Sequence, residues 1–119
     1  MAWYECHDRF TNYVVYWGYI SNTECFQYIN EESIYSGGYV VETMETVLWC
    51  LLNTQNYKEC VLRCVNLGYD ADTTAAVAGG LAGMYYGYNS TPKEWIEQLT
   101  AKEIIDESIL AIEKYCQEL

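Results

Sequence analysis

One stretch decides the fold of this chain, Tyr69-Asp70-Ala71-Asp72-Thr73-Thr74-Ala75-Ala76-Val77-Ala78-Gly79-Gly80-Leu81-Ala82-Gly83. It follows Gly68, a natural helix stop, and its small residues predict a helix over 73–86. A glycine inside a helix costs about 1 kcal/mol relative to alanine, so a helix with three of them needs a packing reason. Close approach of neighbouring backbones is such a reason. The stretch is therefore predicted to be the central helix of the domain.

The segments on either side also show apolar residues at helical spacing. The spacing predicts earlier helices over about 2–20, through Phe26 and Ile29 with Asn22 or Thr23 as a cap, over 39–52 and over 57–67. Ser36-Gly37-Gly38 breaks the chain between them. Thr91 and Thr100 are each predicted to cap a later helix. No run alternates convincingly with period two, so we expect an all-α fold, a compact bundle of five to seven helices in a single domain over 1–119.

The same spacing predicts which side chains face the core. For the helix over 39–52, the expected inward face is Val40, Met44, Val47, Leu48 and Leu51. For the helix over 57–67, it is Tyr57, Cys60, Val61, Cys64 and Val65. Trp95 and Leu99 are also expected to face inward, and the last helix carries an apolar stripe from Ile104 to Tyr115.

Composition and charge exclude several classes of protein. The chain has 119 residues, of which 51% are apolar and 19% charged, so it is not a disordered chain. No stretch approaches the ~18 apolar residues of a membrane helix, and the sequence after Met1 shows no secretory signal. These features predict a cytoplasmic or virion-borne protein. The net charge of −11 argues against direct binding to nucleic acid or to an anionic membrane. It favours basic protein partners, metal cations or simple solubility.

Cysteines are frequent, with six in the chain. None forms a Cys-x-x-Cys pair, and the single histidine, His7, does not complete a zinc signature. Most of them fall on apolar helical faces. We therefore expect reduced thiols that serve as small core residues.

Asp70-Ala71-Asp72-Thr73 is the one segment that carries chemistry. Two carboxylates and a hydroxyl fall at the start of a helix, where they can cap free backbone amides and offset the helix dipole without any further function. The same oxygens suit a hard cation such as Mg²⁺ or Ca²⁺. Three ligands do not fill an octahedron, so water, substrate or other residues would have to supply the rest.

The sequence resembles the ADP-ribosylglycohydrolase family at these residues. The resemblance rests on Ser36–Glu45 followed by Leu48-Trp49-Cys50, and on Val65–Gly83, Tyr85-Tyr86-Gly87 and Pro92–Trp95. It is clear over 36–105 and weak over 1–35. It implies an all-α protein with two Mg²⁺ ions that hydrolyses the bond between ADP-ribose and a protein side chain. By resemblance, Asp70, Asp72 and Thr73 match the C-terminal metal ligands, an incomplete set.

Two features depart from the family. Tyr69 stands where the family often has Gly or Asp, and Ala71 where Thr is common. The chain also lacks the family's N-terminal Gly-Asp-Ala motif, its acidic catalytic residue and its Thr-Asp-Asp cluster. No residue is therefore assigned as catalytic, and any binding of Mg²⁺ is expected to be weak or absent.

These departures predict a stand-alone, truncated domain that is catalytically inactive and acts by binding a protein. One form of this hypothesis is an acidic inhibitor, encoded by a phage or mobile element, of a basic nucleic-acid-processing complex such as a CRISPR effector. The alternative is a subunit or fragment of a Mg-dependent ADP-ribosyl hydrolase, and a third reading is a degenerate remnant. Loss of the N-terminal half would expose apolar surface, with Trp3, Trp17, Trp49, Trp95 and the tyrosines as candidates, and predicts a homodimer.

Overall fold

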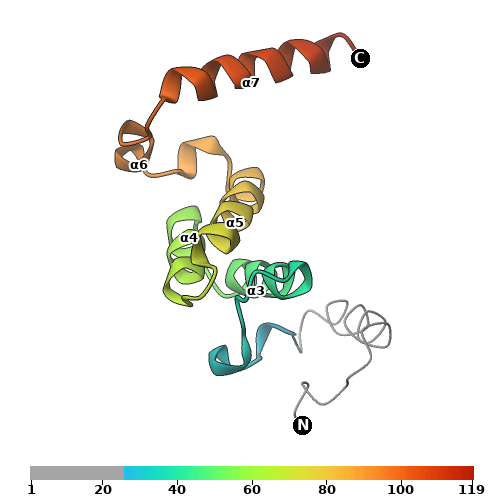
Figure 1. Cartoon of the computed structure of the whole chain (residues 1–119), viewed down its shortest axis with the longest axis vertical. Coiled ribbons are helices and arrows are strands. Elements are labelled where there is room, and N and C mark those ends of the chain that lie inside the picture. Colours follow the sequence, from blue (N-terminus) through green and yellow to red (C-terminus); the bar gives the residue numbers. More distant parts are fainter. Residues whose placement is uncertain (1–25) are drawn as a thin grey trace.

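The computed structural model describes residues 26–119 and holds five α-helices within that range. They are α3 (Val40–Leu52), α4 (Tyr57–Asn66), α5 (Ala71–Tyr86), α6 (Lys93–Glu97) and α7 (Lys102–Gln117). A 3-10 helix, η2 (Glu31–Ser33), precedes α3, and a second, η3 (Tyr88–Ser90), lies between α5 and α6; the described range contains no strand. The predicted all-α helical bundle is confirmed (Figure 1). The helix expected over 2–20 and the cap at Asn22 or Thr23 lie outside the described residues.

Helix α5 is the centre of the packed region, because α3 and α4 both pack against it. Ala78 and Ala82 have no exposed surface. A Cβ added to Gly79 would lie 3.2 Å from the hydroxyl of Tyr57, closer than ordinary van der Waals contact. The small side chains therefore let α4 approach the backbone of α5, which confirms the packing reason predicted for the alanine and glycine run.

The inward face of α3 differs from the prediction. Val40 and Met44 are 65% and 52% exposed, whereas Thr43 and Thr46 are buried. The Thr46 hydroxyl donates a hydrogen bond of 3.1 Å to the carbonyl oxygen of Tyr35, which satisfies this polar group inside the core. Val47 is buried as predicted. The buried face of α3 therefore includes residues with hydroxyl groups, which the spacing of apolar residues alone does not identify.

Trp49 is a second correction, because it was a candidate for exposed surface and is only 2% exposed. Its indole Nε1 donates a hydrogen bond of 3.1 Å to the carbonyl oxygen of Ile29. The Arg63 guanidinium lies 4.4 Å from the centre of its ring. Trp49 thus joins α3, α4 and the segment before η2. Trp3 and Trp17 lie outside the described residues.

The ends of α4 follow the sequence closely. The Asn56 side chain caps the helix by accepting a hydrogen bond of 2.9 Å from the backbone amide of Glu59. The helix ends at Asn66, and Gly68 beyond it has φ +79°, a conformation that favours glycine. Cys60 and Cys64 are buried as predicted, but Val65 is 43% exposed.

The caps predicted for the last two helices are wrong. Pro92, not Thr91, precedes α6, and no side chain makes a capping hydrogen bond there. Ala101, not Thr100, precedes α7, and it has a left-handed backbone with φ +56°. Each threonine lies one residue too early to reach the free amides of the first turn. Trp95 is half-buried, but Leu99 is 49% exposed rather than inward.

Three cysteines form part of the core of the bundle. Cys50, Cys60 and Cys64 are fully buried free thiols, and Cys116 on α7 is an exposed free thiol. The hydrogen bond that the Cys64 thiol donates to Cys50, together with burial, raises the pKa of Cys64 to about 12. A hydrogen bond with Cys64 and burial raise the pKa of Cys60 as well. Cys60 and Cys64 are therefore protonated core residues. Cys6 and Cys25 lie outside the described residues.

Helix α7 contributes nothing to this core. It contains no buried residue, and it extends away from α3, α4 and α5 after the short helix α6 (Figure 1). Its apolar stripe is present but open, with Ile104 66% and Ile112 63% exposed. Among residues 26–119, no helix combines the length and the apolar character needed to cross a membrane.

Candidate functional site

The predicted site residues lie at the start of α5, beneath the loop that precedes α3. Asp70 is the residue before the helix, and its backbone amide donates a hydrogen bond of 2.9 Å to the carbonyl oxygen of Ser36. The hydroxyls of Ser36 and Thr74 are 2.6 Å apart and fully buried. Gly38 packs so closely that an added Cβ would collide with Oδ2 of Asp70. The Ser36–Gly38 loop thus holds both the backbone and the side chain of Asp70 in place.

The two aspartates come together. A hydrogen bond with the Asp70 carboxyl, and then bonds from the first backbone amides of α5, hold the pKa of Asp72 below its usual value. Asp70 is half-buried, and Asp72 and Thr73 are exposed. Asp70 makes no side-chain capping hydrogen bond. Asp70 is therefore not the side-chain cap of α5, whereas the amide bonds to the Asp72 carboxylate are those of a capping residue.

A magnesium ion finds only part of its ligands in the described residues. Mg²⁺ requires near-octahedral oxygen coordination, and Asp70, Asp72 and Thr73 offer two carboxylates and one hydroxyl on one helix start. No cluster of three or more His, Cys, Asp or Glu side chains placed to hold a metal occurs in residues 26–119. These residues alone do not fit a bound magnesium ion.

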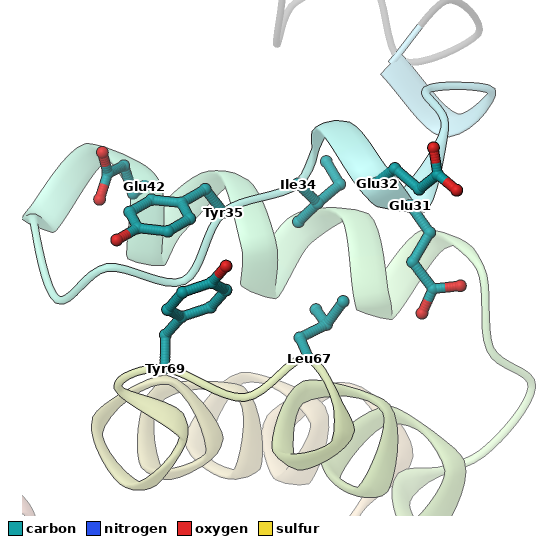
Figure 2. Close-up of a pocket in the computed structure, with 7 residues that line it drawn as sticks. All are labelled: Glu31, Glu32, Ile34, Tyr35, Glu42, Leu67 and Tyr69. Carbon is teal, nitrogen blue, oxygen red and sulfur yellow. The ribbon is translucent and has the colours of Figure 1, made fainter.

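A pocket of about 590 Å³, to which neither aspartate contributes, lies next to the site and was not predicted from the sequence. Tyr69, directly before Asp70, forms one wall, and the rings of Tyr35 and Tyr69 meet edge to face at 4.5 Å. Figure 2 shows these rings between carboxylates of η2 and α3. The full lining is Glu31, Glu32, Ile34, Tyr35, Glu42, Leu67 and Tyr69. The one feature of the sequence that could have indicated this pocket is Tyr69, a bulky residue at a position where the family often has a small or acidic one.

A second, more apolar pocket of about 890 Å³ separates α5 from α7. The α5 side consists of small residues and Met84, and the α7 side of the isoleucine stripe. Met84 is 87% exposed. The apolar surface that was expected to be exposed is therefore present on this side of α5, although Trp49 is not part of it.

Comparison with known proteins decides the family. The sequence profile of ADP-ribosylglycohydrolase matches residues 8–118. The chain belongs to the ADP-ribosylglycohydrolase family. An ADP-ribosylarginine hydrolase Tri1 of Serratia proteamaculans is 43% identical over 74 residues, which are 62% of this chain and 20% of that protein. The Tri1 enzyme of Pseudomonas putida is 38% identical over 100 residues, 84% of this chain and 25% of that protein.

A third relative carries a different substrate in its name. The ADP-ribosyl-[dinitrogen reductase] glycohydrolase of Rhodospirillum rubrum is 46% identical over 67 residues, 56% of this chain and 23% of that protein. The chain thus matches a quarter or less of each of these relatives. It is an ADP-ribosylglycohydrolase-like domain that spans a small part of the family's length.

Proposed function

We propose that this chain supplies the Asp70, Asp72 and Thr73 part of an ADP-ribosyl hydrolase site and does not cleave the ribosyl bond by itself. The observation that carries the proposal is the geometry at the start of α5. The Ser36–Gly38 loop fixes the Asp70 backbone, and the carboxyl groups of Asp70 and Asp72 are joined by a hydrogen bond. No third His, Cys, Asp or Glu of residues 26–119 completes the cluster.

The chemistry of hydrolysis explains why the described part would be inactive alone. Cleavage of a glycosidic bond needs a group that activates water and a group that stabilises the leaving oxygen, placed on either side of the reacting carbon. The residues at the start of α5 can orient a substrate or supply some of the ligands of a cation. They would lie on only one side of the reacting carbon. The three relatives named above are hydrolases of ADP-ribosyl groups, which supports this substrate class.

A graft tests the proposal directly. The segment of the Serratia Tri1 enzyme that matches this chain is replaced by the matching residues of this chain. We expect the grafted enzyme to release ADP-ribose from a protein that is ADP-ribosylated on arginine. This release should stop when a chelator is added. Asp72→Asn in the graft should lower the rate of ADP-ribose release at least about 100-fold, because the site loses one of its negatively charged carboxylates.

Glu97→Gln is the matched control, because Glu97 is an exposed carboxylate at the end of α6. It should leave the rate of the graft unchanged. The isolated 119-residue chain should release no ADP-ribose. Activity of the isolated chain would contradict the second half of the proposal. A folded graft whose rate ignores Asp72→Asn would contradict the first half.

A second candidate is a binding protein without hydrolase activity, and the open face of α7 together with the net charge of −11 favours it. In this proposal, the chain forms a homodimer or inhibits a basic nucleic-acid-processing complex such as a CRISPR effector. Light scattering over a concentration series tests the dimer, and DNA cleavage by a purified effector with added chain tests inhibition. A monomer at high concentration contradicts the first, and unchanged cleavage contradicts the second.

A further inference from the structure

The pocket between η2, α3 and the connection from α4 to α5 combines aromatic rings with carboxylates. Tyr35 and Tyr69 are 40% and 74% exposed, and their edge-to-face contact at 4.5 Å leaves ring surface open to a ligand. Glu42 approaches this pair from α3, and Glu31 and Glu32 line the other end of the pocket (Figure 2). A phosphate would be repelled by these carboxylates, whereas a flat cation would be attracted to both the rings and the acids.

The carboxylates of this pocket are mostly available. The ion pairs within residues 26–119 are Lys58–Glu94 and Arg63–Glu31, the latter at 3.7 Å. Glu32 and Glu42 therefore have no ion-pair partner among the described residues. With a net charge of −11 for the whole chain, the local field at the pocket favours a positively charged partner.

The chain already holds one guanidinium group by this combination of contacts. Arg63 lies 4.4 Å from the Trp49 ring centre, pairs with Glu31 and donates a hydrogen bond of 3.0 Å from Nη1 to the carbonyl oxygen of Asn53. A planar guanidinium can stack on an aromatic face and bond a carboxylate at its edge at the same time. The pocket, which Glu31 also lines, contains the same two kinds of group, aromatic rings and carboxylates.

We propose that this pocket binds an arginine side chain on a basic segment of a partner protein. The guanidinium lies against the Tyr35 and Tyr69 rings, and Glu42 accepts its hydrogen bonds. Nothing in this proposal requires hydrolysis, so it stands or falls separately from the proposed function. An ammonium group fits less well, because it is a compact, strongly hydrated charge without a flat face.

Tyr69 makes the proposal testable without unfolding the chain. Its backbone has φ +56°, a left-handed conformation that costs a non-glycine residue free energy and costs glycine none. Tyr69→Gly therefore removes the aromatic wall and relieves the backbone at the same position. The variant should unfold at the same temperature as the original chain or higher, so any loss of binding reflects the lost ring.

The experiment titrates the full ¹⁵N-labelled chain with blocked peptides that contain three arginines spaced by glycines. We expect backbone resonances of Tyr35, Glu42 and Tyr69 to shift. The matching citrulline peptide, which is neutral and almost the same shape, should not bind in the same concentration range, and the lysine peptide should bind about 5-fold more weakly. Tyr69→Gly should weaken arginine binding about 3- to 10-fold, and Glu42→Gln about 3-fold.

Two control variants keep the test specific. Tyr28→Ala removes an 83% exposed tyrosine that does not line the pocket, and Glu97→Gln removes a carboxylate on α6. Both should bind the arginine peptide like the original chain. The proposal is overturned by an absence of binding, by equal binding of the citrulline or lysine peptide, or by unchanged affinity in both Tyr69→Gly and Glu42→Gln.

Discussion

Helices α5 and α7 have the same length, 16 residues each, yet they play opposite parts in the structure. Helix α5 has a mixed, small-residue sequence without a strong apolar stripe, and it is the centre of the packing. Helix α7 has a regular isoleucine stripe and buries no residue. Amphipathic spacing therefore identifies a helix with an apolar face, but it does not show that this chain provides the surface to cover that face.

The contrast also separates stability from interaction. The free energy of folding must come mainly from the region around α5, where apolar side chains, thiols and hydroxyls leave water. The apolar face of α7 contributes little to the fold described here and is available to another surface.

The largest difference should appear in thiol reactivity. Cys116 on α7 should react with iodoacetamide at pH 8.5 at least about 100-fold faster than Cys50, Cys60 and Cys64, because the core thiols are buried and react only after opening. Mass spectrometry of digests taken over time locates each modified cysteine. Equal rates at Cys116 and Cys64 would show that the region around α5 opens as readily as α7.

The raised pKa of Cys64 fixes the sign of a related pH effect. The folded state holds this proton more tightly than the unfolded state, in which the pKa is near 9.0. The associated stability is fully present below about pH 9 and falls as the pH rises from 9 toward 12. Denaturation midpoints measured across this range should decline, and Cys64→Ala should flatten the decline.

A matched pair of aromatic truncations should show the next largest effect. Trp49→Ala in α3 should lower the free energy of unfolding by about 3–5 kcal/mol, because it removes a buried ring and its hydrogen bond to Ile29. Tyr115→Ala in α7, where the ring is 64% exposed, should change it by less than about 0.5 kcal/mol. Urea denaturation followed by circular dichroism measures both. A comparable loss in Tyr115→Ala would mean that α7 is packed in solution.

Sequence reasoning predicted several parts of this fold that depend on local chemistry, although it placed the caps of α6 and α7 one residue too early. The stop at Gly68, the bounds of α4 and the need for small residues in α5 follow from backbone conformation and from close approach. It also placed Asp70 and Asp72 side by side at a helix start, where the structure has them.

The other errors arose where contacts between residues far apart in the sequence decide the structure. Thr46 is buried because the Tyr35 carbonyl oxygen accepts its hydrogen bond, and nothing in the spacing of α3 reveals that partner. The pocket likewise depends on Tyr35 and Tyr69, which are 34 residues apart and meet only once the start of α5 packs beneath the loop before α3. The spacing of apolar residues along one helix carries no information on such contacts between distant segments.

The smallest effect compares two glycines at which an added methyl group meets no atom within 4 Å. Gly68 has φ +79°, whereas Gly80 lies inside α5 on the side that faces the pocket toward α7. Gly68→Ala should destabilise the fold by about 1–2 kcal/mol, because alanine resists the left-handed region. Gly80→Ala should stabilise it by about 0.5–1 kcal/mol, because alanine favours a helix. The two substitutions add the same methyl group, so their opposite signs can come only from the backbone. If Gly80→Ala instead destabilises the chain, a surface must lie against α5 at this point. The first candidate is the apolar face of α7, and repeating the measurement after deletion of 102–119 would show whether the loss disappears with it.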